Sequence, residues 1–127
     1  IQDGKDVSIF ATGHLVLKAI EATKILEEKG ISVDLINIHT IKPLDIPAVI
    51  ASVSKTKCVV TAEEHQSSSG LGSAIAKVVS ENNPAPIEYV GVNDKFGESG
   101  TTEQLLTKYG MSTQHVVDAA LKVIARK

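Results

Sequence analysis

The stretch VSIFATGHLVLKAIEATKILEEKGISVDLINI, residues 7–38, decides the fold. Residues 7–11 and 32–38 are rich in β-branched and apolar side chains, which favours two strands. Between them, apolar residues recur at three- and four-residue spacing, which predicts an amphipathic helix, and Gly30 provides a left-handed stop. A strand, a helix and a strand in this order predict a βαβ unit with parallel strands.

Two further stretches have the composition of strands. Residues 58–62 are nearly all apolar or small, which predicts a central strand covered on both faces. Residues 87–92 supply the last strand. By contrast, residues 32–38 alternate polar and apolar side chains, which is typical of a strand with one less buried face and favours the edge of the sheet.

Helical signals occupy the segments between and after these strands. Asp45 is placed to cap a helix that continues past Val53. Gly70 opens another helix, which ends at residues 82–84, and a short helix is expected between residues 101 and 110. A last helix begins near Ser112. The side chains expected on its buried face are Val117, Ala120, Leu121 and Ile124.

Strands alternating with helices predict an α/β fold: a three-layer α/β/α, Rossmann-like domain with a mostly parallel sheet of about four to five strands. The length and the 43% apolar content suit one domain over residues 1–127. Right-handed crossovers and the simplest doubly wound order place the first strand between the second and the third. The strand order therefore reverses between the first and third strands, and open sheets of this kind bind ligands at the carboxyl ends of such strands.

Composition excludes several classes of partner. The formal net charge is −2 and the basic residues are scattered, so neither nucleic acid nor an anionic membrane surface is an expected partner. No apolar run approaches the roughly 20 residues that span a bilayer, and we expect a soluble, cytoplasmic protein. Cys58, within an apolar run, is expected to be buried rather than reactive. Because the chain begins with Ile1, we expect a fragment of a longer enzyme.

The carboxyl edge of the sheet is where we expect a ligand or interface crevice. The strand exits and the following turns collect polar groups and glycines at this edge. The residues expected there are Gly13, His14, Glu63, Glu64, His65, Gly70, Gly72 and Ser73.

The chemistry of this crevice has competing interpretations. Gly70 and Gly72 at a helix start can leave amides free for an anion, but glycines more commonly serve close packing of a helix on a sheet. Glu63 and Glu64 would repel a phosphate unless one of them turns away or pairs. A carboxylate beside His65 suits a general base, yet only a serine run in a loop could supply a nucleophile, and no metal-ligand spacing is present. We assign no catalytic, cofactor-binding or metal residue.

Four sequence strings carry a family resemblance. They are TIKPLD (40–45), TAEEH (61–65), GLGS (70–73) and FGESG (96–100). Together they resemble the third, C-terminal domain of transketolase and its relatives, and the resemblance runs over about residues 6–125. It implies a five-stranded mixed sheet whose antiparallel first strand would here be reduced to its last residues.

The resemblance also implies a function for the longer enzyme. Transketolase moves a two-carbon ketol unit between sugar phosphates in the pentose phosphate pathway. Its thiamine diphosphate, magnesium ion and catalytic residues come from two preceding domains. The resemblance therefore implies that this domain binds no cofactor, is inactive alone, helps to assemble a homodimer with the other domains or subunit, and has a possible regulatory ligand site.

Two loops are the expected interface in this interpretation, because they expose apolar or aromatic groups among charges. Folding of Leu44 and Phe96 onto the domain's own core is an equal alternative. The residues of the two loops are Ile41, Lys42, Pro43, Leu44, Lys95, Phe96, Glu98 and Ser99.

Other functions stay open. The same third domain recurs in 1-deoxyxylulose-5-phosphate synthase and in the β subunit of 2-oxo-acid dehydrogenases, although the FGESG string favours transketolase. A freestanding anion-binding or docking module with a flavodoxin-like sheet is the alternative from another class. A flavin-binding module of this kind is disfavoured, because a flavin site needs aromatic walls and aromatic residues make up only 3% of the chain.

Overall fold

The computed structural model describes residues 2–13, 15–38, 45–65, 70–92 and 112–127. Within them, four strands form one parallel sheet in the order β2-β1-β3-β4. The strands are β1 (Val7–Ala11), β2 (Val33–Asn37), β3 (Val59–His65) and β4 (Ile87–Val92). The α/β class and the central position of β1 are as the sequence predicted.

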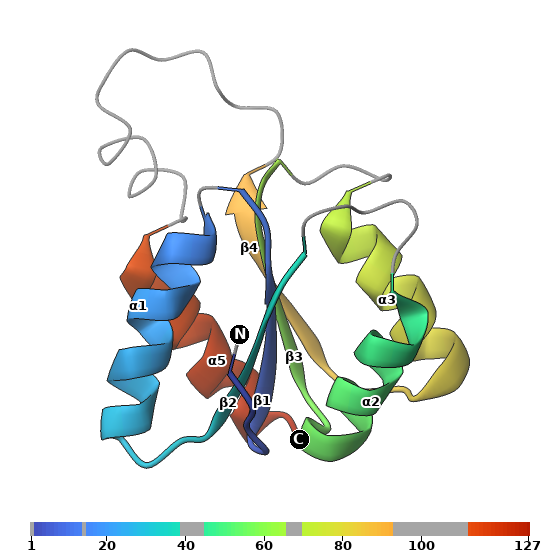
Figure 1. Cartoon of the computed structure of the whole chain (residues 1–127), viewed down its shortest axis with the longest axis horizontal. Coiled ribbons are helices and arrows are strands. Elements are labelled where there is room, and N and C mark those ends of the chain that lie inside the picture. Colours follow the sequence, from blue (N-terminus) through green and yellow to red (C-terminus); the bar gives the residue numbers. More distant parts are fainter. Residues whose placement is uncertain (1, 14, 39–44, 66–69, 93–111) are drawn as a thin grey trace.

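Helices cover both faces of the sheet and complete the three layers. They are α1 (Leu15–Glu28), α2 (Ile46–Thr56), α3 (Leu71–Asn82) and α5 (Thr113–Ala125). α1 and α5 pack side by side on one face, whereas α2 and α3 pack together on the other (Figure 1). The short helix expected between residues 101 and 110 lies outside the described residues. Among the helices that are described, none is both long and apolar enough to cross a membrane.

Burial follows the predicted roles of the strands. Every residue of β1 is buried, since helices cover both of its faces, and the described side chains of β3 are buried as well. β2 ends in two half-buried residues and lies at the edge of the sheet, as its alternating pattern predicted. Its outer side forms a single antiparallel bridge between Gln2 and Leu35, which corresponds to the reduced first strand.

Helix α5 corrects one detail of the expected core. Val117 and Ala120 are buried as predicted, and Ile124 is partly buried against the core. Leu121 was predicted to be buried but is 38% exposed, and Val116 and Val123 are buried instead. The reason is that α5 contacts both the sheet and α1, which turns its buried stripe toward Val116 and away from Leu121.

A connected set of polar side chains is buried beneath α2. Ser8 Oγ lies 2.6 Å from Ser52 Oγ and 2.5 Å from Thr56 Oγ1, and Ser52 donates to Asp34 Oδ2 at 2.5 Å. Asp34 Oδ1 also accepts a hydrogen bond from the backbone amide of Gly4 at 3.1 Å. Buried hydroxyls and carboxylates need such partners, and this network joins the N-terminal segment, the edge strand and α2.

Candidate functional site: the carboxyl edge of the sheet

The exits of β1 and β3 lie next to each other, as the predicted switch point requires. Thr12 N donates to Ala62 O at 3.1 Å, so the turn after β1 is held against the end of β3 just before Glu63. Gly13 follows with a φ of +63°, a left-handed conformation that glycine adopts without strain. The turn that leads into α1 therefore sits beside the first acidic residue of the predicted crevice.

Helix α3 begins at the same edge and takes its cap from β3. Its N-cap residue, Gly70, has extended backbone and no side chain to accept from the first turn. The Glu63 carboxylate supplies both missing acceptors, because Leu71 N donates to Oε2 at 2.8 Å and Gly72 N donates to Oε1 at 3.0 Å. Glu63 is 4% exposed. Of the two carboxylates expected to oppose an anion here, this one pairs with the helix start itself.

Both glycines of this turn have a packing reason. A Cβ on Gly70 would lie 2.8 Å from Glu63 Oε1, so the carboxylate could not keep its position. A Cβ on Gly72 would lie 2.9 Å from the ring of Tyr89 and 3.5 Å from Thr61 Oγ1. Glycine at these positions lets α3 approach the sheet closely and lets Glu63 reach the backbone amides.

Two residues at this site were not among the predicted site residues, although Thr61 belongs to the TAEEH string. Thr61 of β3 pairs with Tyr89 of β4 in the sheet register, and both side chains lie beneath Gly72. Within the part of the chain that the structure describes, Thr61 Oγ1 is the buried side-chain polar atom that lacks a hydrogen-bond partner. Tyr89 is 49% exposed. The sequence placed Tyr89 in the last strand but did not indicate its contact with Gly72.

The remaining predicted residues divide between described and undescribed positions. Glu64 and His65 are the last residues of β3, so their backbone lies at the predicted edge. Ser73 lies in the first turn of α3 and is exposed. His14 and both expected interface loops, residues 41–44 and 95–99, lie outside the described residues.

Metal and thiol chemistry find no support in the described part of the chain. No group of three or more His, Cys, Asp or Glu side chains there could hold a metal ion. Cys58 is fully buried, as expected from its apolar neighbours, and its Sγ lies 3.2 Å from Asp6 O. Burial raises the pKa of this thiol, only partly offset by the positive charge of Lys127, so the reactive thiolate is disfavoured.

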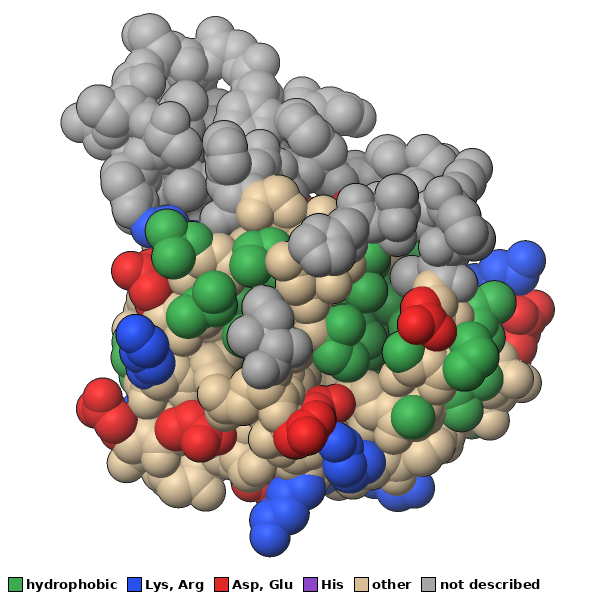
Figure 2. Space-filling model, viewed as in Figure 1, with side chains coloured by type: hydrophobic (Ala, Val, Ile, Leu, Met, Phe, Trp, Pro, Cys, Tyr) green, Lys and Arg blue, Asp and Glu red, His purple; other side chains and the backbone are tan. Residues whose placement is uncertain are grey.

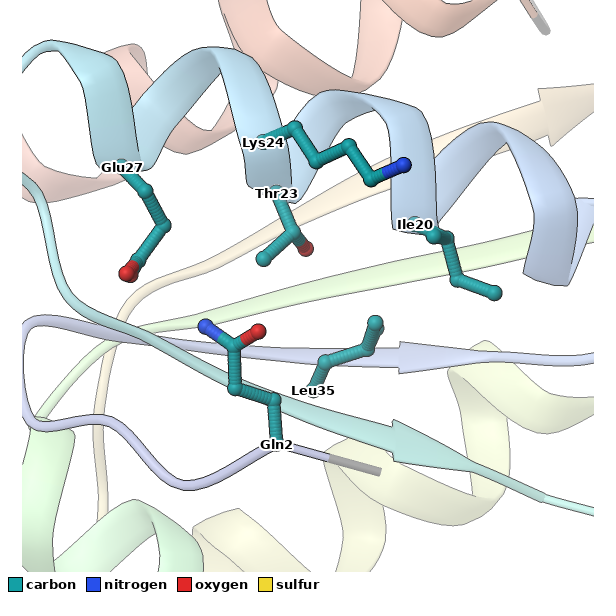
Figure 3. Close-up of a pocket in the computed structure, with 6 residues that line it drawn as sticks. All are labelled: Gln2, Ile20, Thr23, Lys24, Glu27 and Leu35. Atoms are coloured by element: carbon teal, nitrogen blue, oxygen red, sulfur yellow. The ribbon is translucent and has the colours of Figure 1, made fainter.

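A small pocket lies away from this edge, between α1 and the outer side of β2. Its volume is about 260 Å³, and Ile20, Thr23 and Leu35 form much of its wall, with Gln2, Lys24 and Glu27 around them (Figure 3). Glu27 Oε2 already accepts from Val33 N at 3.1 Å. None of the predicted site residues lines this pocket, and its lining suggests no reaction.

Among the described residues, the face shown in Figure 2 has no patch of charges of a single sign. Acidic and basic side chains are interspersed there, with hydrophobic side chains between them. A mixed surface of this kind does not attract a polyanion over a long range. This distribution agrees with the small net charge of the chain.

The sequence matches the family model described as "Transketolase, C-terminal domain" over residues 1–116. The chain belongs to the transketolase C-terminal domain family. Its four-strand parallel sheet with helices on both faces is the α/β/α domain that the sequence predicted, and in the described residues the antiparallel first strand implied by the resemblance is represented by the Gln2–Leu35 bridge.

Relatives of the transketolase-type domain include a transketolase subunit and a synthase. The "6-deoxy-6-sulfo-D-fructose transketolase subunit SqwH" of Clostridium sp. (strain MSTE9) is 45% identical over 127 residues, which cover 100% of this chain and 39% of the relative. The "1-deoxy-D-xylulose-5-phosphate synthase" of Halothermothrix orenii (strain H 168) is 38% identical over 124 residues, covering 96% of this chain and 20% of the relative.

A solved structure agrees with this assignment. It is described as "Split gene transketolase, inactive beta4 tetramer", and it superposes with a TM-score of 0.92 at 47% identity. The match covers 98% of this chain and 41% of that chain. The transketolase-type domain thus spans well under half the length of these similar proteins. The similar proteins are transferases of more than one specificity.

Proposed function

We propose that this chain is the C-terminal domain of a thiamine-diphosphate-dependent transketolase, in which other domains or a separate subunit transfer the two-carbon ketol unit between sugar phosphates. The observation that carries the proposal is the match of the whole chain, at 45% identity, to 39% of a protein named as a transketolase subunit. The agreement in fold with a split-gene transketolase at a TM-score of 0.92 supports it.

In this proposal the domain is inactive by itself and binds no cofactor. The described residues do not fit thiamine diphosphate, because the helix start best placed to hold a diphosphate already donates two hydrogen bonds to Glu63. A second carboxylate, Asp34, is committed to the polar network under α2. The α3 amides and the Asp34 carboxylate therefore stabilise the fold, whereas a cofactor site would leave such groups free to bind the cofactor.

The domain's role in the enzyme is assembly. We propose that the carboxyl-edge crevice and the loops at residues 41–44 and 95–99 dock onto the other domains or subunit, and that a regulatory ligand can bind near Glu64 and His65. A homodimer, the pentose phosphate pathway and a cytoplasmic location belong to the same proposal. The tetramer of the related split-gene enzyme supports contacts between subunits, although it was described as inactive.

A second candidate is the equivalent domain of a 1-deoxy-D-xylulose-5-phosphate synthase. The 38% identity over 96% of the chain favours it specifically. The two candidates share the fold and differ in the product of the complete enzyme.

Reconstitution tests the proposal. The chain is mixed with the remaining portion of a split transketolase, thiamine diphosphate and magnesium, and the mixture is assayed for ketol transfer and separately for 1-deoxy-D-xylulose 5-phosphate. We expect ketol transfer only in the mixture, together with co-elution on a sizing column. Formation of 1-deoxy-D-xylulose 5-phosphate instead would establish the second candidate, and activity of the chain alone would refute the inactive role.

A further inference from the structure

In other proteins, helix starts such as that of α3 commonly bind anions. The first amides of a helix lack intrahelical partners, and the aligned peptide dipoles favour negative charge there. In this chain Gly70 offers no side chain as a cap, and Leu71 and Gly72 are buried. Something must therefore accept hydrogen bonds from these two amides.

Glu63 meets this need from an adjacent strand. Its two carboxylate oxygens bind the two amides separately, at 2.8 and 3.0 Å, in the arrangement by which a phosphate or free carboxylate would bind a helix start. The absence of a Cβ atom at Gly70 leaves the space that the carboxylate occupies when it accepts from these amides. These two hydrogen bonds join the end of β3 directly to the start of α3.

We propose that Glu63 is a built-in anion that occupies the α3 start and closes it to phosphate. A phosphorylated ligand or an acidic partner group that meets the carboxyl edge must then be recognised by groups other than these amides. A phosphate could enter only by displacing a carboxylate that is 4% exposed, and the two negative charges would then lie side by side.

The test follows the Leu71 and Gly72 amide signals of the ¹⁵N-labelled chain by NMR. Wild-type protein is titrated with inorganic phosphate and with sodium formate against chloride of equal ionic strength. We expect no saturable shift of either signal. A saturable shift of both signals with phosphate in the wild type would overturn the proposal, because it would show that an external anion takes the site.

Substitution of the carboxylate gives the converse result. In Glu63→Ala we expect the thermal midpoint to fall by about 5–15 °C. Formate should recover part of this loss and produce saturable shifts of both amide signals, since the two donors and the space for a carboxylate remain. Glu63→Ala with an unchanged midpoint and no formate response would refute the role of Glu63.

Two further variants keep the test informative. Glu81→Ala removes an exposed carboxylate from the other end of the same helix and should show neither the loss nor the rescue. If Glu63→Ala fails to fold, Glu63→Gln retains the side-chain volume while losing one acceptor oxygen. We expect it to fold with a lowered midpoint that formate does not restore, because its carboxamide still fills the space. Full stability of Glu63→Gln would contradict the proposal.

Discussion

Helices α2 and α3 lie side by side on one face of the sheet, yet their starts are stabilised in different ways. At α2, exposed Asp45 is itself the N-cap and accepts from Ala48 N at 3.2 Å, three residues along the chain. At α3, buried Glu63 belongs to the neighbouring strand and accepts from both Leu71 N and Gly72 N. One cap is local and exposed to water, whereas the other exists only when sheet and helix are packed together.

This difference has an energetic consequence. Loss of an exposed cap leaves amides that water can solvate, so the cost is modest. Loss of a buried cap leaves donors that water cannot reach, so the full cost of desolvation is felt. The two helix starts should therefore respond very differently to the same chemical change.

Among the substitutions that compare the helix starts, the largest effect should come from exchanging carboxylate for carboxamide at the buried cap. Glu63→Gln places an NH₂ group against a backbone donor, and we expect a loss of about 2–3 kcal/mol in the free energy of unfolding. Asp45→Asn is the matched change at α2 and should be nearly neutral, because Asn caps as well as Asp. Urea unfolding of both variants measures the contrast, and equal effects would show that the two caps are equivalent.

The close packing at α3 should give the next largest effect. Gly72→Ala puts a Cβ 2.9 Å from the Tyr89 ring, and we expect a loss of about 1–2 kcal/mol from this crowding. In a Tyr89→Ala background the same substitution should become neutral or stabilising, since Ala favours a helix over Gly by about 1 kcal/mol. A double-mutant cycle from denaturant curves measures this coupling. An identical cost in both backgrounds would place the strain elsewhere.

Removal of the local cap at α2 should have a smaller effect. Asp45→Ala leaves the amide of Ala48 to water and should cost about 1 kcal/mol. Thermal unfolding of Asp45→Ala and of Asp45→Asn measures the two effects separately. The Ala variant loses both the acceptor and the charge, whereas the Asn variant loses only the charge. If Asp45→Ala proved as damaging as Glu63→Gln, exposure would not be what distinguishes the two helix starts.

The smallest effect is expected at the start of α5. Ser112 Oγ accepts from His115 N over a long 3.4 Å and also contacts His115 Nδ1 at 2.6 Å, in an exposed position. We expect Ser112→Ala to lower the free energy of unfolding by about 0.5 kcal/mol. Denaturant unfolding of this variant beside Asp45→Ala completes the series, and a loss above that of Asp45→Ala would reverse the predicted order.

The same contrast between local and non-local contacts explains which sequence predictions succeeded. Asp45 and Gly30 were recognisable because a cap and a helix stop act within a few residues of chain. The edge position of β2 was recognisable from its alternating side chains. Leu121 was assigned to the wrong face because helical periodicity alone does not say how α5 is rotated between the sheet and α1.

The sequence by itself determined the α/β class, the order of the elements and the family, because strand and helix periods, turn residues and short motifs are properties of neighbouring residues. Only the tertiary structure decided that Glu63 faces α3 and that Tyr89 lies against Gly72. These contacts depend on the register between strands and on the distance of a helix from the sheet. Both are set by the packing of the whole core, which no local stretch of sequence contains.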